Sequence, residues 1–174
     1  MRLFIIRLRR AALLDASLYR EVRADPGALS QAVLAVALSS LALGAGVSGE
    51  KGAAGFGLGI LSALVSWFLW AVLTYAIGTR LLPVAGPKVT VRELLRALGF
   101  SASPGLLNFI GLIPYMSAFI FCVTQIWMLV AMIAAIRAVF DYPGYARAAG
   151  VCVIGWVLQS GLQILVLSIL DAVR

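Results

Sequence analysis

The sequence contains no histidine, only two cysteines and few charged residues. Without histidine, a Ser-His-Asp catalytic triad cannot be assembled. A structural zinc site usually needs four cysteine or histidine ligands, and Cys122 and Cys152 form no CxxC pair. Each cysteine lies inside an apolar run, so we expect two buried free thiols that pack as small hydrophobic side chains. The sequence therefore predicts no metal site, no cofactor and no disulfide framework.

Charge is scarce while apolar residues are abundant. Charged residues make up 12% of the 174 residues, and 63% are hydrophobic. A soluble domain is typically about 45–50% apolar and about 25% charged. A water-soluble fold of this length cannot hide so much apolar surface, so we expect the excess to face lipid. The composition predicts an integral membrane protein with a single domain.

Acidic residues are rarer than basic ones, and the net charge is +7. The basic residues stand between long apolar runs rather than among aromatic residues on one face, which argues against nucleic acid as a partner. We interpret them as topology signals and as contacts for anionic lipid headgroups. No acidic pair is spaced for acid–base chemistry, and no glycine-rich phosphate loop follows a strand. We therefore expect no catalytic residues and no enzyme activity.

The N-terminal segment, residues 1–25, is basic and lacks a long apolar run. Its apolar stretch, Leu3–Ile6, is shorter than the region of about 7–15 residues that a signal peptide needs. We expect the segment to stay on the mature protein and to lie in the cytoplasm. Two interpretations remain open: a solvated, partly ordered tail held near anionic lipid, or a helix that docks a partner.

Long apolar segments indicate the fold. A bilayer core about 30 Å thick requires about 20 apolar residues of helix. We predict an all-α, polytopic membrane helical bundle with about five transmembrane helices. The predicted spans are residues 29–47, 54–77, 97–113, 117–139 and 148–170. Asp25 and Pro26 mark the start of the first span, because aspartate caps free N–H groups and proline fits the first turn.

Basic residues fall mainly in alternate segments between the spans. The rule that basic segments remain inside places the N-terminus in the cytoplasm and the C-terminus in the periplasm. The third span is the weakest, since it contains Pro104, which removes a helix hydrogen bond, and Asn108. We predict a span broken at Pro104, with a re-entrant segment as the alternative. Glu93 and Arg96 lie at its cytoplasmic entrance, where Thr90 and Glu93 fit a capping box.

A few residues are candidates for packing or interaction. Gly55 and Gly59 form a small-xxx-small pair, which lets helix backbones approach closely, either within the chain or in a homodimer. Arg137 is expected to pair with Glu93 or Asp141 at the cytoplasmic face. The following side chains form interhelical hydrogen bonds or line a polar cavity near the middle of the membrane: Asn108, Gln125, Gln159 and Gln163.

Four short motifs follow one another in the first four fifths of the chain. They are Leu18–Pro26, Trp67–Gly78, Glu93–Pro104, and Trp127 followed by Ala134–Arg137. Together, from Tyr19 to Arg137, they resemble the bacterial branch of the Yip (Ypt-interacting protein) family of membrane proteins. The resemblance implies a five-span helical bundle in the bacterial inner membrane with a cytoplasmic N-terminus. Eukaryotic relatives bind small Rab/Ypt GTPases through a much longer cytoplasmic N-terminal region.

Two classes of function remain. The sequence favours a non-enzymatic scaffold or accessory protein that interacts with lipids and with other membrane proteins or a second copy of itself. The alternative is a small transporter, channel or lipid-moving protein that uses the broken third helix, because interrupted helices often frame substrate sites.

Overall fold

The computed structural model describes residues 1–47, 53–83, 88–113 and 115–172, without the side chains of 46, 47, 53–56, 162–167 and 169–172. All regular structure in these ranges is helical. The elements are α1 (Arg2–Ala12), α2 (Ala16–Ala24), α3 (Ala28–Val47), α4 (Ala53–Ala76), the π-helix η1 (Ile77–Leu81), α5 (Val91–Ser101), the 3-10 helix η2 (Ser103–Leu112), α6 (Ser117–Phe140) and α7 (Tyr145–Ala172).

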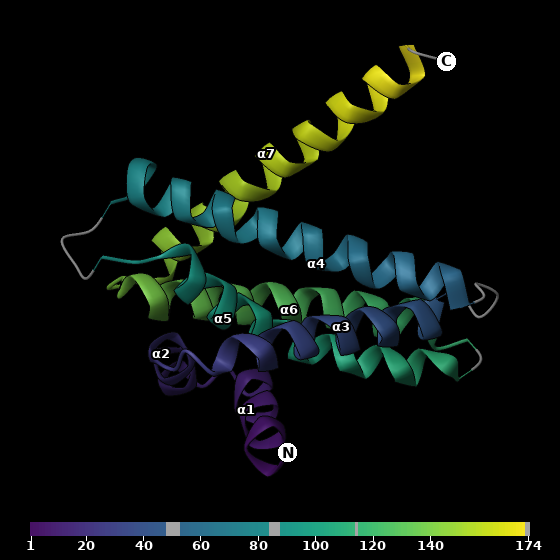
Figure 1. The fold of residues 1–174 in the computed structure, drawn as a ribbon, viewed down its shortest axis with the longest axis horizontal. Helices are drawn as coiled ribbons and strands as arrows, with labels where there is room; N and C mark the ends of the chain where they lie inside the picture. Colours follow the sequence, from purple (N-terminus) through teal and green to yellow (C-terminus); the bar gives the residue numbers. More distant parts are fainter. Residues whose placement is uncertain (48–52, 84–87, 114, 173–174) are drawn as a thin grey trace.

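Within the described residues, three stretches of helix are long and apolar enough to cross a membrane. They are Ala28–Ala45 of α3, Gly57–Leu81 of α4 and η1, and Ser117–Phe140 of α6, and they match three predicted spans. α3 packs against both α4 and α6, and the three helices run in similar directions in Figure 1. In these three stretches, only 33%, 17% and 28% of the residues, respectively, are buried inside the molecule. The molecule is therefore a helical bundle whose long helices leave much apolar surface uncovered.

The predicted third span, residues 97–113, is divided between two helices of different type. α5 begins after Thr90, whose N–H donates to the Glu93 carboxylate at 2.7 Å while its hydroxyl accepts the Glu93 N–H at 3.3 Å. The predicted capping box is thus confirmed. α5 ends at Ser101, and the chain continues as η2 with Pro104 in its first turn. Proline suits that place because the first N–H groups of a helix have no partner within it.

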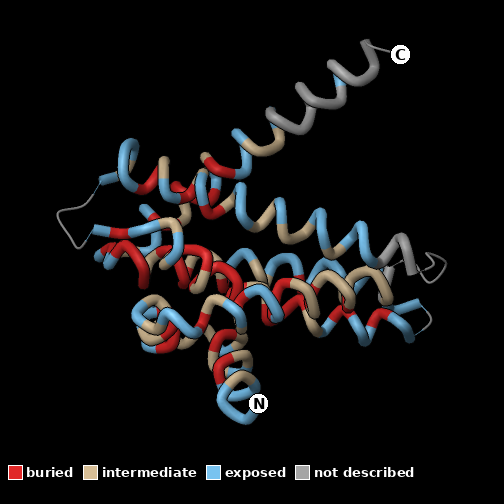
Figure 2. The backbone as a smooth tube through the Cα atoms, in the orientation of Figure 1, coloured by how far each residue is buried: buried red, intermediate tan, exposed pale blue. Residues whose placement is uncertain are grey.

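α5 lies at the most densely packed part of the bundle. Figure 2 shows buried residues concentrated around α5 and the C-terminal half of α6. α3 packs against both α5 and η2. At Gly99 the two backbones approach closely, because a Cβ added there would lie 2.6 Å from the Cβ of Ala32. Glycine is therefore the residue that fits between α5 and α3.

The N-terminal segment is folded, so its interpretation as a solvated, partly ordered tail is wrong. α2 packs against α5 and α6, and α1 packs against α5 and η2. Tyr19 is completely buried, and its hydroxyl donates to the carbonyl of Ala11 at 3.1 Å. Trp127 of α6 donates its indole N–H to the carbonyl of Ala12 at 2.8 Å. Two side chains from other helices thus bind the carbonyl groups at the end of α1.

Of the two alternatives for the small-residue pair, packing within the chain is wrong at Gly59, and the expected burial of the cysteines is wrong at Cys122. Gly59 is exposed, and a Cβ added there would meet no described atom within 4 Å, so α4 does not use this residue to pack inside the chain. Gly55 lies outside the residues whose side chains are described. Cys122 is exposed on α6, whereas Cys152 is buried as expected. The sequence shows that the side chains on a helix face are small or apolar, but not whether that face packs against another helix of the chain.

We expect Gly99→Val to destabilise the bundle, since its added methyl groups would be forced against α3. Overpacking of this kind typically costs about 1–3 kcal/mol. Thermal unfolding of the purified protein in detergent, followed by circular dichroism, measures the effect. Gly59→Val is the matched control, because it makes the same change at a position where an added Cβ would meet no described atom within 4 Å. A midpoint in Gly99→Val as high as in this control would contradict the close approach of α3 and α5.

Candidate functional site: the charged end and the bundle cavity

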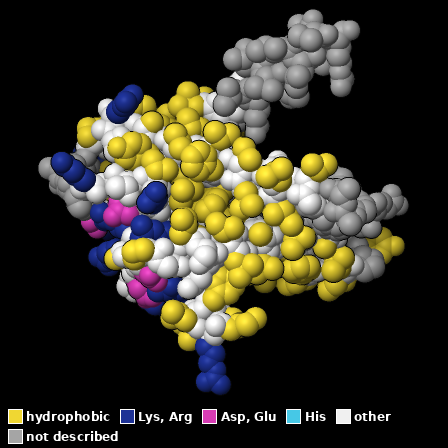
Figure 3. Space-filling model, in the orientation of Figure 1, with side chains coloured by type: hydrophobic (Ala, Val, Ile, Leu, Met, Phe, Trp, Pro, Cys, Tyr) yellow, Lys and Arg dark blue, Asp and Glu magenta, His cyan; other side chains and the backbone are white. Residues whose placement is uncertain are grey.

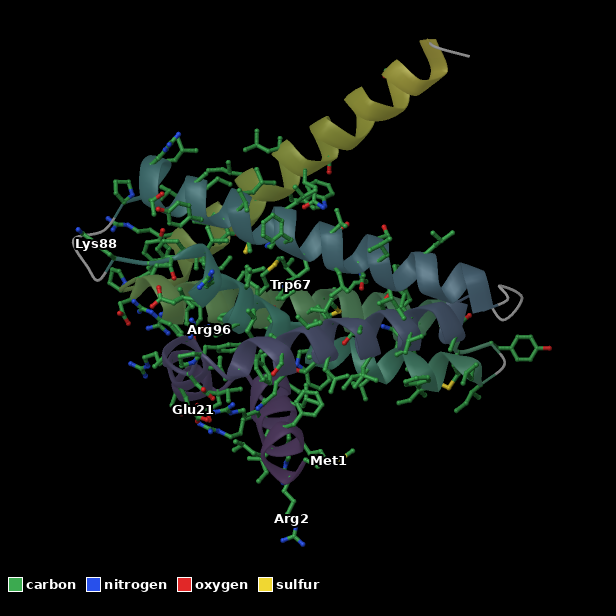
Figure 4. The ribbon with its side chains drawn as sticks, viewed as in Figure 1. Met1, Arg2, Glu21, Trp67, Lys88 and Arg96 are labelled. Atoms are coloured by element: carbon green, nitrogen blue, oxygen red, sulfur yellow. The ribbon has the colours of Figure 1, made fainter. Side chains whose placement is uncertain are left out.

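Charged side chains gather at one end of the bundle, around α2, the start of α5 and the end of α6. We call this region the charged end. Figure 3 shows the contrast between this end and the hydrophobic side chains that cover much of the long helices on the visible face. Glu21, Lys88 and Arg96 lie at the charged end in Figure 4, whereas Met1 and Arg2 lie at the tip of α1.

Among the described side chains, the most deeply buried charge is Arg7 of α1, which is only 6% exposed. Its Nη2 lies 3.0 Å from the Glu21 carboxylate and 2.8 Å from the Asp25 carboxylate. Its Nη1 donates to Gln31 Oε1 at 3.2 Å. These partners belong to α2, the turn before α3, and α3 itself, so one guanidinium joins three helices. Its hydrogen bonds also hold the pKa of Asp25 below the usual value.

Arg10 extends the same network. Its Nε lies 2.8 Å from Asp15, and its Nη1 lies 2.6 Å from Glu21. Hydrogen bonds from Arg10, and then from Arg7, lower the pKa of Glu21. Hydrogen bonds from Ser17 and Arg10 lower the pKa of Asp15 to about 2. These carboxylates are therefore ionised at neutral pH, and they hold α1 against α2.

Arg23 of α2 is the observed partner of the two acids that were expected to bind Arg137. Its Nε lies 3.5 Å from Glu93, and its Nη1 lies 3.4 Å from Asp141. Arg137 instead holds its guanidinium carbon 4.3 Å from the centre of the Tyr145 ring. The acids thus have a different partner from the predicted one, because the folded α2 brings Arg23 between α5 and α6.

The remaining predicted residues at this end have structural contacts. Arg96 donates from Nη1 to the carbonyl of Arg23, which joins α5 to the end of α2. Asp25 accepts the N–H of Gly27 at 2.9 Å just before α3 begins, and Pro26 is exposed in the same turn. α3 therefore begins where the Asp-Pro pair predicted a start.

A cavity of about 710 Å³, open on one side, lies between the helices, with walls from α3, α4, α5, η2, α6 and α7. Most of the wall is apolar and includes Trp67, which Figure 4 labels on α4, and Trp70. The polar residues in the wall are Ser39, Ser40, Ser66, Ser101, Asn108, Gln125 and Gln159. Three of the four amide residues that were considered for a polar cavity are thus in its wall, and the fourth, Gln163, lies outside the described side chains.

Asn108 joins η2 to α6 in the wall of this cavity. Its side chain is almost fully buried, and its Nδ2 donates to the Gly105 carbonyl at 2.8 Å. The Thr124 hydroxyl lies 2.9 Å from Asn108 Oδ1 and also 2.9 Å from the carbonyl of Ile120. A hydroxyl has a single proton, so Thr124 donates to one of these oxygens at a time. Asn108 therefore joins η2 to α6 through its Oδ1, while its Nδ2 binds a carbonyl within η2 itself.

Some buried polar atoms in the cavity wall have no hydrogen-bond partner among the described residues. They are Trp67 Nε1, Trp70 Nε1 and Gln159 Oε1. An unsatisfied buried polar group typically costs about 1–3 kcal/mol. A hydrogen-bond partner for each of these atoms would remove this cost.

The residues that sequence analysis missed are the arginines of α1 and Trp127. Arg7 and its partners lie 14 to 24 residues apart on separate helices, so no helical period connects them. One signal was nonetheless present, because three of the seven acidic residues fall between positions 15 and 25, close to these arginines. Nothing in the sequence around Trp127 indicates that its indole reaches α1.

We expect Arg7→Gln to release α1 and α2 from the bundle more often, because Glu21 and Asp25 lose their shared cation. Removing one partner of a buried ion pair typically costs about 3–5 kcal/mol, and the partial exposure of both carboxylates lowers this figure here. The rate of trypsin cleavage within α2, which follows the opened population, should rise roughly tenfold or more. Arg9→Gln removes the same charge from an exposed position on α1 and should leave the rate unchanged. Equal rates in the two variants would show that the buried contacts of Arg7 contribute nothing.

Acid pH should weaken the same network. The pKa values of Asp15, Glu21 and Asp25 are lowered in the folded protein, so their stabilisation is complete above the ordinary carboxyl pKa. It is lost as the pH falls through the lowered values. We expect the thermal midpoint to drop below about pH 4, and Glu21→Gln to have a lower midpoint at neutral pH with a smaller further drop. An acid-induced drop of the same size in Glu21→Gln would mean that other groups cause it.

No protein-family model matches the chain, and comparison with curated proteins and with solved structures finds no match either. The resemblance to the Yip family rests on the sequence motifs themselves.

Proposed function

We propose that the chain is a non-enzymatic integral membrane protein that acts as a scaffold or accessory protein for lipids and other membrane proteins. The observation that carries this proposal is the contrast between the charged end and the apolar outer surface of the long helices. At most 33% of each candidate span is buried by the chain itself. When lipid acyl chains surround such an apolar surface, it needs no contact with further protein.

The proposed layout has five spans, with the charged end in the cytoplasm and the C-terminus in the periplasm of a bacterial inner membrane. The α5–η2 segment and α7 supply the third and fifth spans. In Figure 1, α5 and η2 together run along α3 toward the end where α6 begins, which favours a crossing over a re-entrant segment. Arg10, Arg96 and Arg137 come from the three segments expected in the cytoplasm, and all three lie at the charged end. The rule that basic segments stay inside supports this orientation.

α1 supports a contact with lipid headgroups. It runs crosswise to α3 in Figure 1 and exposes Leu3, Ile5 and Ile6 beside Arg2 and Arg9. A helix that lies in the interface of a membrane buries apolar side chains among the headgroups and keeps its basic residues near the phosphates. Each basic residue near an anionic surface contributes about 1 kcal/mol. We therefore propose anionic lipid headgroups of the cytoplasmic leaflet as partners, and no nucleic acid.

The exposed small residues of α4 support a contact with another membrane helix. Neither Gly57 nor Gly59 has a described atom within 4 Å of the position that a Cβ would occupy. Small residues on a lipid-facing surface let a second helix approach closely. The proposed partner is another membrane protein or a second copy of this chain.

The Yip-type motifs support the same class of protein. Tyr19, Glu93 and Arg96, which belong to these motifs, all connect α2 or α5 to the rest of the charged end. Binding of Rab/Ypt GTPases is not part of the proposal. The eukaryotic relatives use a long cytoplasmic segment for it, whereas α1 and α2 here pack on their own bundle.

Crosslinking in native membranes, followed by purification and mass spectrometry, tests the scaffold role. We expect a protein partner, and a crosslinker placed at Gly59 should capture it more efficiently than one at Ile126, an exposed position on α6. Capture of lipid alone from both positions would refute the role as a protein scaffold.

The cavity supports a second candidate function, that of a small transporter or lipid-moving protein. Ligand cavities typically measure about 300–1,000 Å³ and combine apolar walls with a few polar groups. The bundle cavity, at about 710 Å³, has this character, and its wall includes the η2 segment next to Pro104. Interrupted helices line substrate sites in many transporters.

Reconstitution into liposomes tests this second candidate. We expect Ala63→Phe, which fills the cavity from α4, to reduce lipid scrambling or solute flux, while Leu61→Phe on the exposed side of the same helix leaves it unchanged. Wild-type activity equal to that of empty liposomes would exclude the transport function.

A further inference from the structure

A second, smaller cleft lies at the charged end, where α2, α6 and the first residue of α7 meet. Its volume is about 260 Å³. Arg20 of α2 and Arg137 of α6 both line it, together with Asp141 and Tyr145. Two arginines from different helices therefore converge on one small space.

Neither arginine forms an ion pair with an acid in the part of the chain that the structure describes. Every acidic residue with a described side chain is already paired with another arginine: Asp15, Glu21 and Asp25 with Arg7 or Arg10, and Glu93 and Asp141 with Arg23. Arg20 and Arg137 thus supply positive charge that the described carboxylates leave unneutralised. An anion from outside the chain would complete this arrangement.

The setting of Arg137 suits a phosphate. Its guanidinium carbon lies 4.3 Å from the centre of the Tyr145 ring. A guanidinium held over an aromatic ring keeps its in-plane N–H groups available, and their planar fork matches two oxygens of a phosphate. Arg20 is exposed and approaches the same cleft from α2. Charge-assisted hydrogen bonds of this kind are about twice as strong as neutral ones.

We propose that this cleft binds the phosphate of an anionic phospholipid headgroup. The inference rests on the proposed function, because it requires the charged end to lie at a membrane surface. Basic pockets beside transmembrane helices on the cytoplasmic side are typical headgroup sites. The cleft is smaller than the roughly 300–1,000 Å³ of ordinary ligand pockets, so it holds a headgroup while the acyl chains remain outside.

Asp141 favours a lipid phosphodiester over free phosphate. Its carboxylate lines the cleft, and its Oδ2 lies 3.4 Å from Arg23 Nη1, which offsets part of its charge. A second negative charge on the ligand would be repelled by this carboxylate. The singly charged diester of a phospholipid therefore fits better than inorganic phosphate, which is partly dianionic at neutral pH.

Native mass spectrometry of the full-length protein in a mild detergent, titrated with phosphatidylglycerol, tests the site. We expect Arg20→Gln and Arg137→Gln each to weaken binding of the first lipid roughly tenfold. Arg137→Lys, which keeps the charge and loses the fork, should give an intermediate loss. Arg80→Gln is the matched control, since Arg80 is exposed on η1, carries the same charge and does not line the cleft. It should bind like the wild type.

Three results would overturn the proposal. The first is an equal loss in Arg80→Gln and Arg20→Gln, which would mean diffuse attraction. The second is equally tight binding of phosphatidylcholine, and the third is displacement of the lipid by inorganic phosphate at matched ionic strength. Arg20 is exposed, so Arg20→Gln should keep the wild-type unfolding midpoint and carry the test even if Arg137→Gln folds poorly. The titration needs no protein partner, so its result is independent of the crosslinking experiment.

Discussion

The buried guanidinium of Arg7 is the interaction on which the charged end depends. It contacts carboxylates of α2 and of the turn before α3, and it donates to Gln31 of α3. A buried charge is costly unless it is paired, so the three helices must meet in one arrangement for Arg7 to be accommodated. That arrangement brings α2 onto α5 and α6, where it buries Tyr19 and places Arg23 beside Glu93. It also sets Arg20 next to Arg137, since both line the same cleft.

The charged end is held by contacts within the chain, whereas the long helices leave much of their apolar surface uncovered. At the charged end, ion pairs and a dense core around α5 fix the helices. Along α4 and the first half of α6, much of the surface is apolar and uncovered by the chain. In the wall of the bundle cavity, the buried indole N–H groups of Trp67 and Trp70 have no hydrogen-bond partner among the described residues. A bundle of this kind has a fixed arrangement of helices at the charged end and an uncovered apolar surface along its long helices. Such a surface suits the proposed contacts with lipids and other membrane proteins.

Part of this structure could be predicted because its causes are local. Three helices long and apolar enough to cross a membrane follow from the length of apolar runs, and the capping box follows from the spacing of Thr90 and Glu93. The docking of α1 and α2 could not, since Arg7 finds its partners on other helices and no periodicity connects them. The partner of Glu93 was predicted wrongly for the same reason, because Arg23 belongs to a segment for which the sequence allowed either a solvated tail or a docking helix. At Gly59, the sequence shows a small residue but not the surface that it faces. The amides considered for a polar cavity were found from their rarity in apolar spans, whereas the Arg20–Arg137 cleft depends entirely on the fold.

Amide hydrogen exchange of the intact protein in lipid nanodiscs tests most directly whether α1 and α2 belong to the bundle. The interior amides of α2, from Tyr19 to Val22, should exchange nearly as slowly as those of α5, because both helices are buried in the same core. Exchange of these α2 amides at the rate of an unstructured peptide, with α5 still protected, would contradict the central role of the Arg7 network.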